Sequence, residues 1–227
     1  MFNGASDWKS RFRPNGRLTF LKGFLRHPTA VGSITPSSRF LERRIVASAE
    51  IAQARMVVEL GPGTGGTTRA ILNALPPTSR LLTLEINPGF VAYLRSLPDP
   101  RLRVQLGSAE RIGEALAEHG LPRPDAVVSG IPFSTMPAEC GRRILQAIWA
   151  CLAPGGCFVA YQFVKRVAEL EPETLGLPEV SMEFLNVPPV HVYRWRKPGA
   201  ARRPAATSAT FEGRETDQRP FPADPPP

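Results

Sequence analysis

The stretch Val57-Val58-Glu59-Leu60-Gly61-Pro62-Gly63-Thr64-Gly65-Gly66 decides the fold of this chain. Its apolar beginning predicts a short strand over residues 56–60, and a helical pattern follows over residues 67–75. Glycines between the two allow a sharp turn, a close approach of a ligand to the backbone at Gly63, and close packing of the helix at Gly65. The stretch therefore predicts the first unit of an α/β sheet, with a ligand at the carboxyl end of its leading strand.

Outward from this stretch, strand and helix patterns alternate along the chain. Strands are expected at residues 56–60, 81–86, 103–106, 126–129 and 157–163, and helices at 36–53, 67–75, 88–97, 112–118, 137–152 and, shorter, 166–171. Thr35 is the expected N-cap of the first helix, with Pro36 at its first position. Residues 180–186 and 190–195 have no helix between them and indicate an antiparallel hairpin. The pattern predicts a doubly wound, mostly parallel sheet of seven strands with a Rossmann-like architecture.

Composition divides the 227 residues into three parts. With 42% hydrophobic residues, the chain can build one core domain, which we place at residues 36–196. Residues 197–227 contain seven prolines and are expected to be disordered. No apolar run approaches ~18 residues and no apolar signal segment follows the N-terminus, so neither a transmembrane helix nor a secretory signal is expected. The three cysteines form no Cys-x-x-Cys pair, so we expect no metal site and a reducing, cytosolic compartment.

The basic residues are concentrated before the core. Residues 1–44 hold nine basic and two acidic residues, which gives +7 of the net charge of +8. Within residues 1–35, the segment 17–26 places Leu18, Leu21 and Leu25 on one helical face with basic residues beside them. Such a segment is typical of an amphipathic helix in an anionic membrane interface, and the alternative is a helix packed on the core. The charge alone fits either acidic lipid headgroups or nucleic acid.

The loop spacing and two carboxylates indicate which cofactor the glycine loop binds. The spacing G-x-G-x-G is neither that of a dinucleotide loop nor that of a P-loop. Glu59 lies two residues before the first glycine, where a carboxylate repels a pyrophosphate and suits the ammonium of a methionine group. Glu85, at the end of the next strand, is placed to accept two hydrogen bonds from a ribose diol. These features predict S-adenosylmethionine as the cofactor.

The predicted cofactor site extends to other segments at the same edge of the sheet. Adenine is expected against Ile86 and against residues 107–110, where Ser108 or Glu110 contacts the base unless it serves only as a helix cap. The cofactor-binding residues expected from the sequence are Glu59, Leu60, Gly61, Pro62, Gly63, Thr64, Gly65, Glu85, Ile86, Ser108, Ala109 and Glu110.

The loop after the fourth predicted strand is expected to present the methyl acceptor. Backbone carbonyls near Ser129 and Gly130 could accept hydrogen bonds from an amine, and Pro132 would stiffen the loop. Phe133 could stack on a base or face a cationic nitrogen. Tyr161, near the end of the fifth predicted strand, either faces the acceptor or belongs to the core. The base that deprotonates the amine stays open between Glu110, Tyr161 and water.

The cofactor loop together with Ser129-Gly130-Ile131-Pro132-Phe133 resembles the ribosomal RNA adenine dimethylase superfamily. Members of that superfamily carry Asn-x-Pro-Tyr/Phe in the acceptor loop, and this chain lacks the Asn that holds the base.

Two further stretches are similar to bacterial phospholipid N-methyltransferases. They are Pro28-Thr29-Ala30-Val31-Gly32-Ser33-Ile34-Thr35-Pro36-Ser37-Ser38-Arg39 and Phe184-Leu185-Asn186-Val187-Pro188-Pro189-Val190-His191-Val192-Tyr193-Arg194-Trp195. The similarity spans about residues 20–196 and implies a class I methyltransferase, peripheral on the inner face of the cytoplasmic membrane. The implied reaction methylates the amine of phosphatidylethanolamine toward phosphatidylcholine. The alternatives are RNA adenine N6-methylation and a non-catalytic protein that binds S-adenosylmethionine or lipid.

Overall fold

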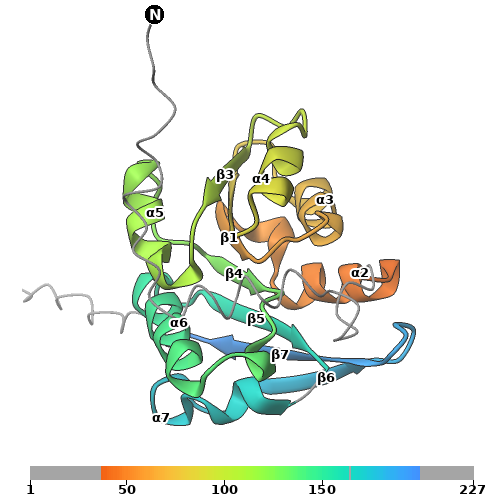
Figure 1. Cartoon of the computed structure of the whole chain (residues 1–227), viewed down its shortest axis with the longest axis vertical. Helices are drawn as coiled ribbons and strands as arrows, with labels where there is room; N and C mark the ends of the chain where they lie inside the picture. The colour runs from red at the N-terminus through yellow and green to blue at the C-terminus, as the bar shows by residue number, and fades with distance from the viewer. Residues whose placement is uncertain (1–36, 164, 200–227) are drawn as a thin grey trace, which may run out of the picture.

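Seven strands form one sheet with helices on both faces (Figure 1). The computed structural model describes residues 37–163 and 165–199. The strands are β1 (Met56–Leu60), β2 (Arg80–Glu85), β3 (Leu102–Leu106), β4 (Ala126–Ser129), β5 (Cys157–Gln162), β6 (Glu179–Glu183) and β7 (Val190–Arg196). The helices are α2 (Arg39–Ser48), α3 (Gly66–Ala74), α4 (Pro88–Arg95), α5 (Ile112–Glu118), α6 (Ala138–Cys151) and α7 (Pro172–Leu175). Short 3-10 helices lie at Ile51–Gln53, Ala109–Arg111, Phe133–Thr135 and Lys165–Glu169.

The strand order is β3-β2-β1-β4-β5-β7-β6. Strands β1 to β5 are parallel, whereas β7 is antiparallel to both β5 and β6. This order confirms the predicted doubly wound α/β sheet with its closing hairpin. The direction of winding reverses between β1 and β4, where Leu60 pairs with Ser129. The loops that leave these two strands therefore begin side by side, at the place where such sheets bind ligands.

Two apolar cores cover the two faces of the sheet. On one face, α5 and α6 pack on the strands, with Leu145 and Ile148 fully buried and Phe158 stacked on Trp195 at 5.1 Å between ring centroids. On the other face, α2 and α3 bury residues such as Ile45. Because both faces are covered, every residue of β1 is buried. A charged residue in that strand, Glu59, is therefore an exception that needs a physical reason.

The predicted start and end of the first helix are wrong. Helix α2 begins after Ser38, whose hydroxyl accepts a hydrogen bond from Leu41 N at 3.2 Å, and it ends at Ser48. Glu50 then adopts a left-handed conformation (φ 51°), which a helix cannot continue through. The Glu50 carboxylate is held there by Arg194 and Arg196 of β7. An anchor from a distant strand is not visible in local sequence, so the expected helix was too long.

Most other element boundaries agree with the sequence prediction to within a few residues. The expected helix 166–171 is instead a 3-10 helix over Lys165–Glu169, and α7 was not predicted. Among the strands the largest difference is at β6, which ends at Glu183 because residues 184–189 form the tip of the hairpin. Several expectations concern residues outside the described part of the chain: the cap by Thr35, the amphipathic segment 17–26, and the tail beyond residue 199. Within the described residues, no helix is long and apolar enough to cross a membrane.

Candidate cofactor and acceptor site

The loop of residues 61–65 leaves the carboxyl end of β1 and enters α3. Its position is fixed by backbone bonds from Gly61 N to Leu84 O of β2 (2.9 Å) and from Gly65 N to Pro62 O (3.0 Å). Gly63 has φ 54°, and a Cβ built on it would meet no atom within 4 Å. The backbone at Gly63 therefore faces open space, as an approaching ligand requires.

Glu59 is buried in β1, directly before this loop. Its side-chain oxygen Oε2 accepts a hydrogen bond of 2.6 Å from the hydroxyl of Thr68 on α3. The second oxygen, Oε1, is buried and has no hydrogen-bond partner among the described residues. Burial raises the pKa of Glu59 to about 8, the Thr68 bond opposes this shift, and the nearby Glu85 adds to it. An unpaired buried oxygen beside an open backbone fits a ligand that brings a cationic hydrogen-bond donor, such as an ammonium.

Glu85 ends β2 and is held by backbone N–H groups. Its Oε1 accepts from Ile86 N and Asn87 N, each at 2.8 Å, and its Oε2 accepts from Gly63 N at 3.1 Å. The carboxylate thus connects the end of β2 to the glycine loop and is fixed before any ligand arrives. Each carboxylate oxygen has about two acceptor sites, so Oε2 retains capacity for a hydroxyl group. This arrangement fits the predicted contact with a ribose diol.

The remaining residues of the predicted loop contribute in different ways. The Leu60 side chain is fully buried in the core and its carbonyl accepts from Gly130 N at 3.0 Å, while its expected contact with the cofactor stays a prediction. Pro62 is buried, Thr64 is exposed, and Ile86 is half-buried. The buried Pro62 can shape the loop, whereas Thr64 and Ile86 have surface that a ligand could contact.

The segment after β3 enters a 3-10 helix at Ala109–Arg111. Ser108 caps this helix, with its hydroxyl accepting from Glu110 N at 3.3 Å, and Ala109 is buried. The Glu110 carboxylate pairs with Arg143 of α6 (3.0 Å) and accepts from the Cys140 thiol (3.1 Å). The Glu110 carboxylate is thus held against α6, and the contact with adenine expected of Ser108 or Glu110 stays a prediction.

The acceptor loop lies beside the glycine loop. A Cβ built on Gly61 would come within 3.1 Å of the Ile131 side chain. Ser129 is fully buried, and its hydroxyl accepts from Ile131 N at 3.3 Å. Pro132 starts a 3-10 turn that Thr135 closes by donating to the Pro132 carbonyl at 2.9 Å. The register between β1 and β4 therefore brings the predicted donor and acceptor loops together.

Phe133 does not face this space. Its side chain is fully buried in the core between the sheet and α6. A Cβ on Gly141 of α6 would lie 3.5 Å from the Phe133 ring, which places that helix in van der Waals range of the ring. The expectation that the ring meets a base or an amine is wrong for the described structure, because the 3-10 turn directs it inward.

Tyr161 connects the acceptor loop to α3. Its hydroxyl lies 3.4 Å from Thr67 Oγ1, and a Cβ on Gly130 would be only 2.3 Å from it. Only glycine fits at position 130 while this hydroxyl is present. Burial strongly raises the pKa of Tyr161, so its phenol keeps its proton. Tyr161 therefore lies at the predicted acceptor side, but as a neutral donor.

Sequence reasoning missed Thr68 and Gln162. The Gln162 amide donates to the carbonyls of Ile131 (2.6 Å) and Tyr161 (2.8 Å), and its oxygen accepts from Phe133 N (3.2 Å). Gln162 thus fixes the acceptor loop onto the end of β5. Thr68 could have been found as a hydroxyl residue on the inner face of the helix that follows the glycine loop. Gln162 could have been found as an amide residue at the end of an apolar strand.

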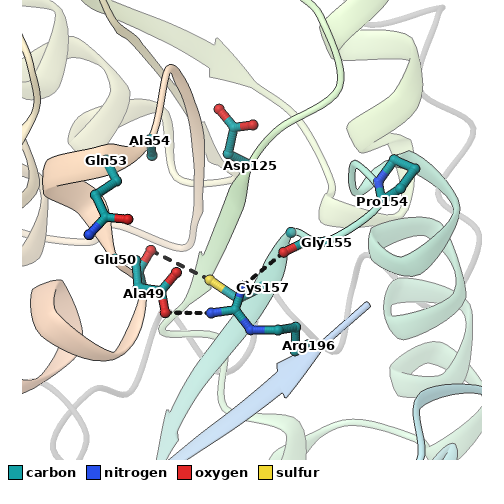
Figure 2. Close-up of a pocket in the computed structure, with 10 residues that line it drawn as sticks. Ala49, Glu50, Gln53, Ala54, Asp125, Pro154, Gly155, Cys157 and Arg196 are labelled. Carbon is teal, nitrogen blue, oxygen red and sulfur yellow. Dashed lines mark hydrogen bonds and ion pairs between the residues drawn. The ribbon is translucent and has the colours of Figure 1, made fainter. Parts of the chain in front are cut away.

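A cavity of about 220 Å³ lies apart from this site, near the amino ends of β4 and β5 (Figure 2). Its lining includes Asp125, Cys157 and Arg196, which stand at the amino ends of β4 and β5 and at the carboxyl end of the antiparallel β7. Figure 2 shows Arg196 directed toward Glu50 and Gly155 across this cavity. It is therefore on the edge of the sheet opposite the glycine loop. The described residues contain no cluster of His, Cys, Asp and Glu suited to a metal ion.

Comparison with known proteins assigns this chain to a family. No family model matches the chain. Over 141 residues, the chain is 36% identical to an ornithine lipid N-methyltransferase of Singulisphaera acidiphila, covering 61% of this chain and 73% of that enzyme. The chain belongs to the family of that enzyme, the class I S-adenosylmethionine-dependent methyltransferases that act as N-methyltransferases.

One further curated relative and two solved structures are also similar to this methyltransferase. Ribosomal RNA small subunit methyltransferase A of Phenylobacterium zucineum is 32% identical over 96 residues, which cover 41% of this chain and 32% of that enzyme. Among solved structures, the N-methyltransferase NodS of Bradyrhizobium japonicum is similar with a TM-score of 0.55 and 15% identity, covering 70% of this chain and 97% of that one. A Burkholderia thailandensis 1,6-didemethyltoxoflavin-N1-methyltransferase, solved with S-adenosylhomocysteine, gives a TM-score of 0.56 and 16% identity, covering 80% and 87%. These two structures support the fold.

Proposed function

We propose that this methyltransferase transfers methyl groups from S-adenosylmethionine to the amine headgroup of an aminolipid. The observation that carries the proposal is the 36% identity to an ornithine lipid N-methyltransferase over most of that enzyme's length. The sequence resemblance to phosphatidylethanolamine methylation suggests a second lipid with the same reactive group. Ornithine lipid and phosphatidylethanolamine both offer an amine, and the shared chemistry is attack by a neutral nitrogen lone pair.

The cofactor supplies an electrophilic methyl group on a sulfonium. The chain's own residues hold and orient it: Glu59 Oε1 would pair with the ammonium, and Glu85 Oε2 would accept from the ribose. The backbone at Gly63 leaves room for the methionine portion. Because both carboxylates are fixed by Thr68 and by backbone N–H groups, little reorganisation is needed on binding.

The acceptor side works by positioning. Gln162 and the Tyr161 hydroxyl set the backbone from residue 130 to residue 133, and the Gly130 carbonyl would receive an N–H group of the amine. Neither candidate base fits proton removal. Tyr161 keeps its own proton, and Glu110 is paired with Arg143. We infer that the amine reaches the site neutral or loses its proton to water.

The RNA alternative has less support from the site. The relatives that modify ribosomal RNA align over about a third of their own length, and the loop lacks the base-holding Asn. Phe133, the ring that would stack on a base, is buried. We therefore favour a lipid acceptor, with the basic residues 1–44 on an anionic membrane surface at the inner face of the cytoplasmic membrane.

The decisive experiment offers the purified chain labelled S-adenosylmethionine and three acceptors in parallel: vesicles with phosphatidylethanolamine, vesicles with ornithine lipid, and ribosomal RNA. Thin-layer chromatography of the lipids should show methylated product with at least one of the two lipids. Label in RNA with none in either lipid would contradict the proposal. A chain with Glu59→Gln controls for contaminating activity.

A further inference from the structure

The tip of the β6–β7 hairpin exposes three apolar side chains. Phe184, Leu185 and Val187, here called the apolar tip, are exposed to 70%, 61% and 80%. Figure 1 shows this hairpin projecting beyond the end of the sheet, next to α2. Three large apolar side chains together at a projecting tip are unusual for a surface that meets only water.

The polar residues of the same turn point inward and hold it. Glu183 accepts from Leu185 N at 3.0 Å and from the Arg44 guanidinium at 2.7 Å. Asn186 accepts from Ser38 N at 3.0 Å and donates to the Pro188 carbonyl at 2.8 Å. Glu183 and Asn186 are both buried. The turn is therefore built so that its polar groups are satisfied within the protein while its apolar groups stay outside.

Positive charge lies beside the apolar tip. The bond from Ser38 to Asn186 attaches the start of α2 to the turn, and Arg39 and Arg43 of that helix are exposed. Apolar side chains beside exposed guanidinium groups match an anionic bilayer, with acyl chains below and phosphate groups above. A purely apolar partner surface would leave these charges without counterparts.

The apolar tip is also at the correct edge of the sheet. Strand β7 runs antiparallel to β5, so His191 at its start pairs with Gln162 at the carboxyl end of β5. The tip precedes β7 and therefore lies at the edge where the glycine loop and the acceptor loop leave β1 and β4. A surface touched by the tip would face the opening of the methyl-transfer site.

We propose that the apolar tip inserts into an anionic lipid bilayer, while Arg39 and Arg43 bind its headgroups, so that the acceptor loop meets a lipid amine at the membrane surface. This inference rests on the proposed function and adds the membrane-contacting element to it. It involves described residues and is independent of residues 1–36.

The test uses the full chain and vesicles of phosphatidylglycerol and phosphatidylethanolamine in equal amounts. Phe184→Ser/Leu185→Ser should lower the partition coefficient about tenfold, because partition scales with the apolar area that enters the interface. The matched single variants are Leu185→Ser and Leu177→Ser. Leu177 is 92% exposed but adjoins Gly176, whose carbonyl accepts from Trp195 at the opposite edge of the sheet. Of these two single variants, only Leu185→Ser should weaken vesicle binding.

Insertion itself is measured with Phe184→Trp. Subtracting the emission spectrum of the unchanged chain leaves the fluorescence of the added tryptophan. This emission should shift to the blue on vesicles and be quenched by lipids brominated in the acyl chain. Unchanged partition of the double variant, or an extra fluorescence signal that no brominated lipid quenches, would overturn the inference. A third outcome would also overturn it: the unchanged chain is a dimer in solution, and the double variant is a monomer that still binds vesicles. A second copy of the chain would then cover the tip.

Failure of this inference is distinguishable from failure of the proposed function. The tip variants should keep the cofactor affinity of the unchanged chain and should methylate a detergent-dispersed aminolipid at the same rate. Absence of any methylated lipid in both detergent and vesicles would instead contradict the proposed function.

Discussion

The hydroxyl of Thr68 donates a 2.6 Å hydrogen bond to the buried carboxylate of Glu59, and this bond occupies only one of the two carboxylate oxygens. The other oxygen is buried without a partner among the described residues, and we expect the ammonium of the cofactor to pair with it. Burial of a carboxylate costs several kcal/mol unless it is paired, so the free protein carries a cost that a cationic ligand removes. Cofactor binding and the protonation of Glu59 should therefore be coupled.

The first prediction concerns the pH dependence of binding. The pKa of Glu59 is raised to about 8 in the free protein, and only its ionised form pairs with an ammonium. Affinity for S-adenosylmethionine should therefore fall as pH decreases below about 8, by up to roughly tenfold per pH unit. Calorimetry from pH 6 to pH 9 measures this. Glu59→Gln should bind weakly with no such slope, and an identical slope in that variant would place the titration elsewhere.

Stability should show the opposite pH trend in the free protein. The folded pKa of Glu59, about 8, is above its ordinary value of 4.5, so the folded state holds a proton that the unfolded state has released between these values. The free energy of unfolding should decrease as pH rises from about 4.5 to about 8. Glu59→Gln removes this contribution, so the variant should be more stable than the unchanged chain at pH 8. Urea denaturation at pH 5 and pH 8 checks it, and equal pH slopes would be inconsistent with a buried, titrating Glu59.

A third prediction separates backbone strain from loss of ligand space. Gly63→Val should abolish cofactor binding, because its side chain would enter the open space beside the loop. Gly120→Val is the matched control: Gly120 also has positive φ (61°) and no atom within 4 Å of its Cβ position, but it follows the end of α5. Both variants should lose a similar amount of thermal stability. If both bind the cofactor equally well, residue 63 does not line the site.

Gly130 and Tyr161 should behave as a coupled pair. Gly130→Ala places a methyl group 2.3 Å from the Tyr161 hydroxyl, so the acceptor loop must move and methyl transfer should slow by at least about tenfold. Removing the hydroxyl with Tyr161→Phe should restore part of the rate in the double variant, although the ring carbon remains at 2.9 Å. A double-mutant cycle of rates measures the coupling. Strictly additive losses would argue against contact between the two positions.

Gln162 should affect the acceptor side only. Gln162→Leu leaves Phe133 N and the Ile131 carbonyl without their side-chain partner, so the acceptor loop loses its attachment to β5. We expect kcat to fall about tenfold while cofactor affinity stays within about twofold, because misplacing a reacting group costs rate rather than donor binding. Single-turnover kinetics and calorimetry separate the two effects. A large drop in cofactor affinity would contradict the assigned role.

Periodicity and loop chemistry were sufficient to predict most of this fold. The buried apolar strands and the glycine spacing located β1, β4 and α5 at their observed bounds, and the lack of a helical pattern between residues 180–186 and 190–195 indicated the antiparallel β6–β7 pair. What failed depends on distant partners. Arg194 and Arg196 hold Glu50 and end α2 early, and Arg143 holds the Glu110 carboxylate against α6. Phe133 likewise turns inward into the core beneath α6, which no local pattern shows.

The most direct test of the account is calorimetric titration of the purified chain with S-adenosylmethionine, beside NAD and ATP, in the unchanged chain and in Glu59→Gln. We predict saturable binding of S-adenosylmethionine to one site, with no competition from NAD or ATP. Binding to the variant should be at least about a hundredfold weaker because a buried charge pair is lost. Equal affinity in both chains, or NAD or ATP held in place of S-adenosylmethionine, would contradict it.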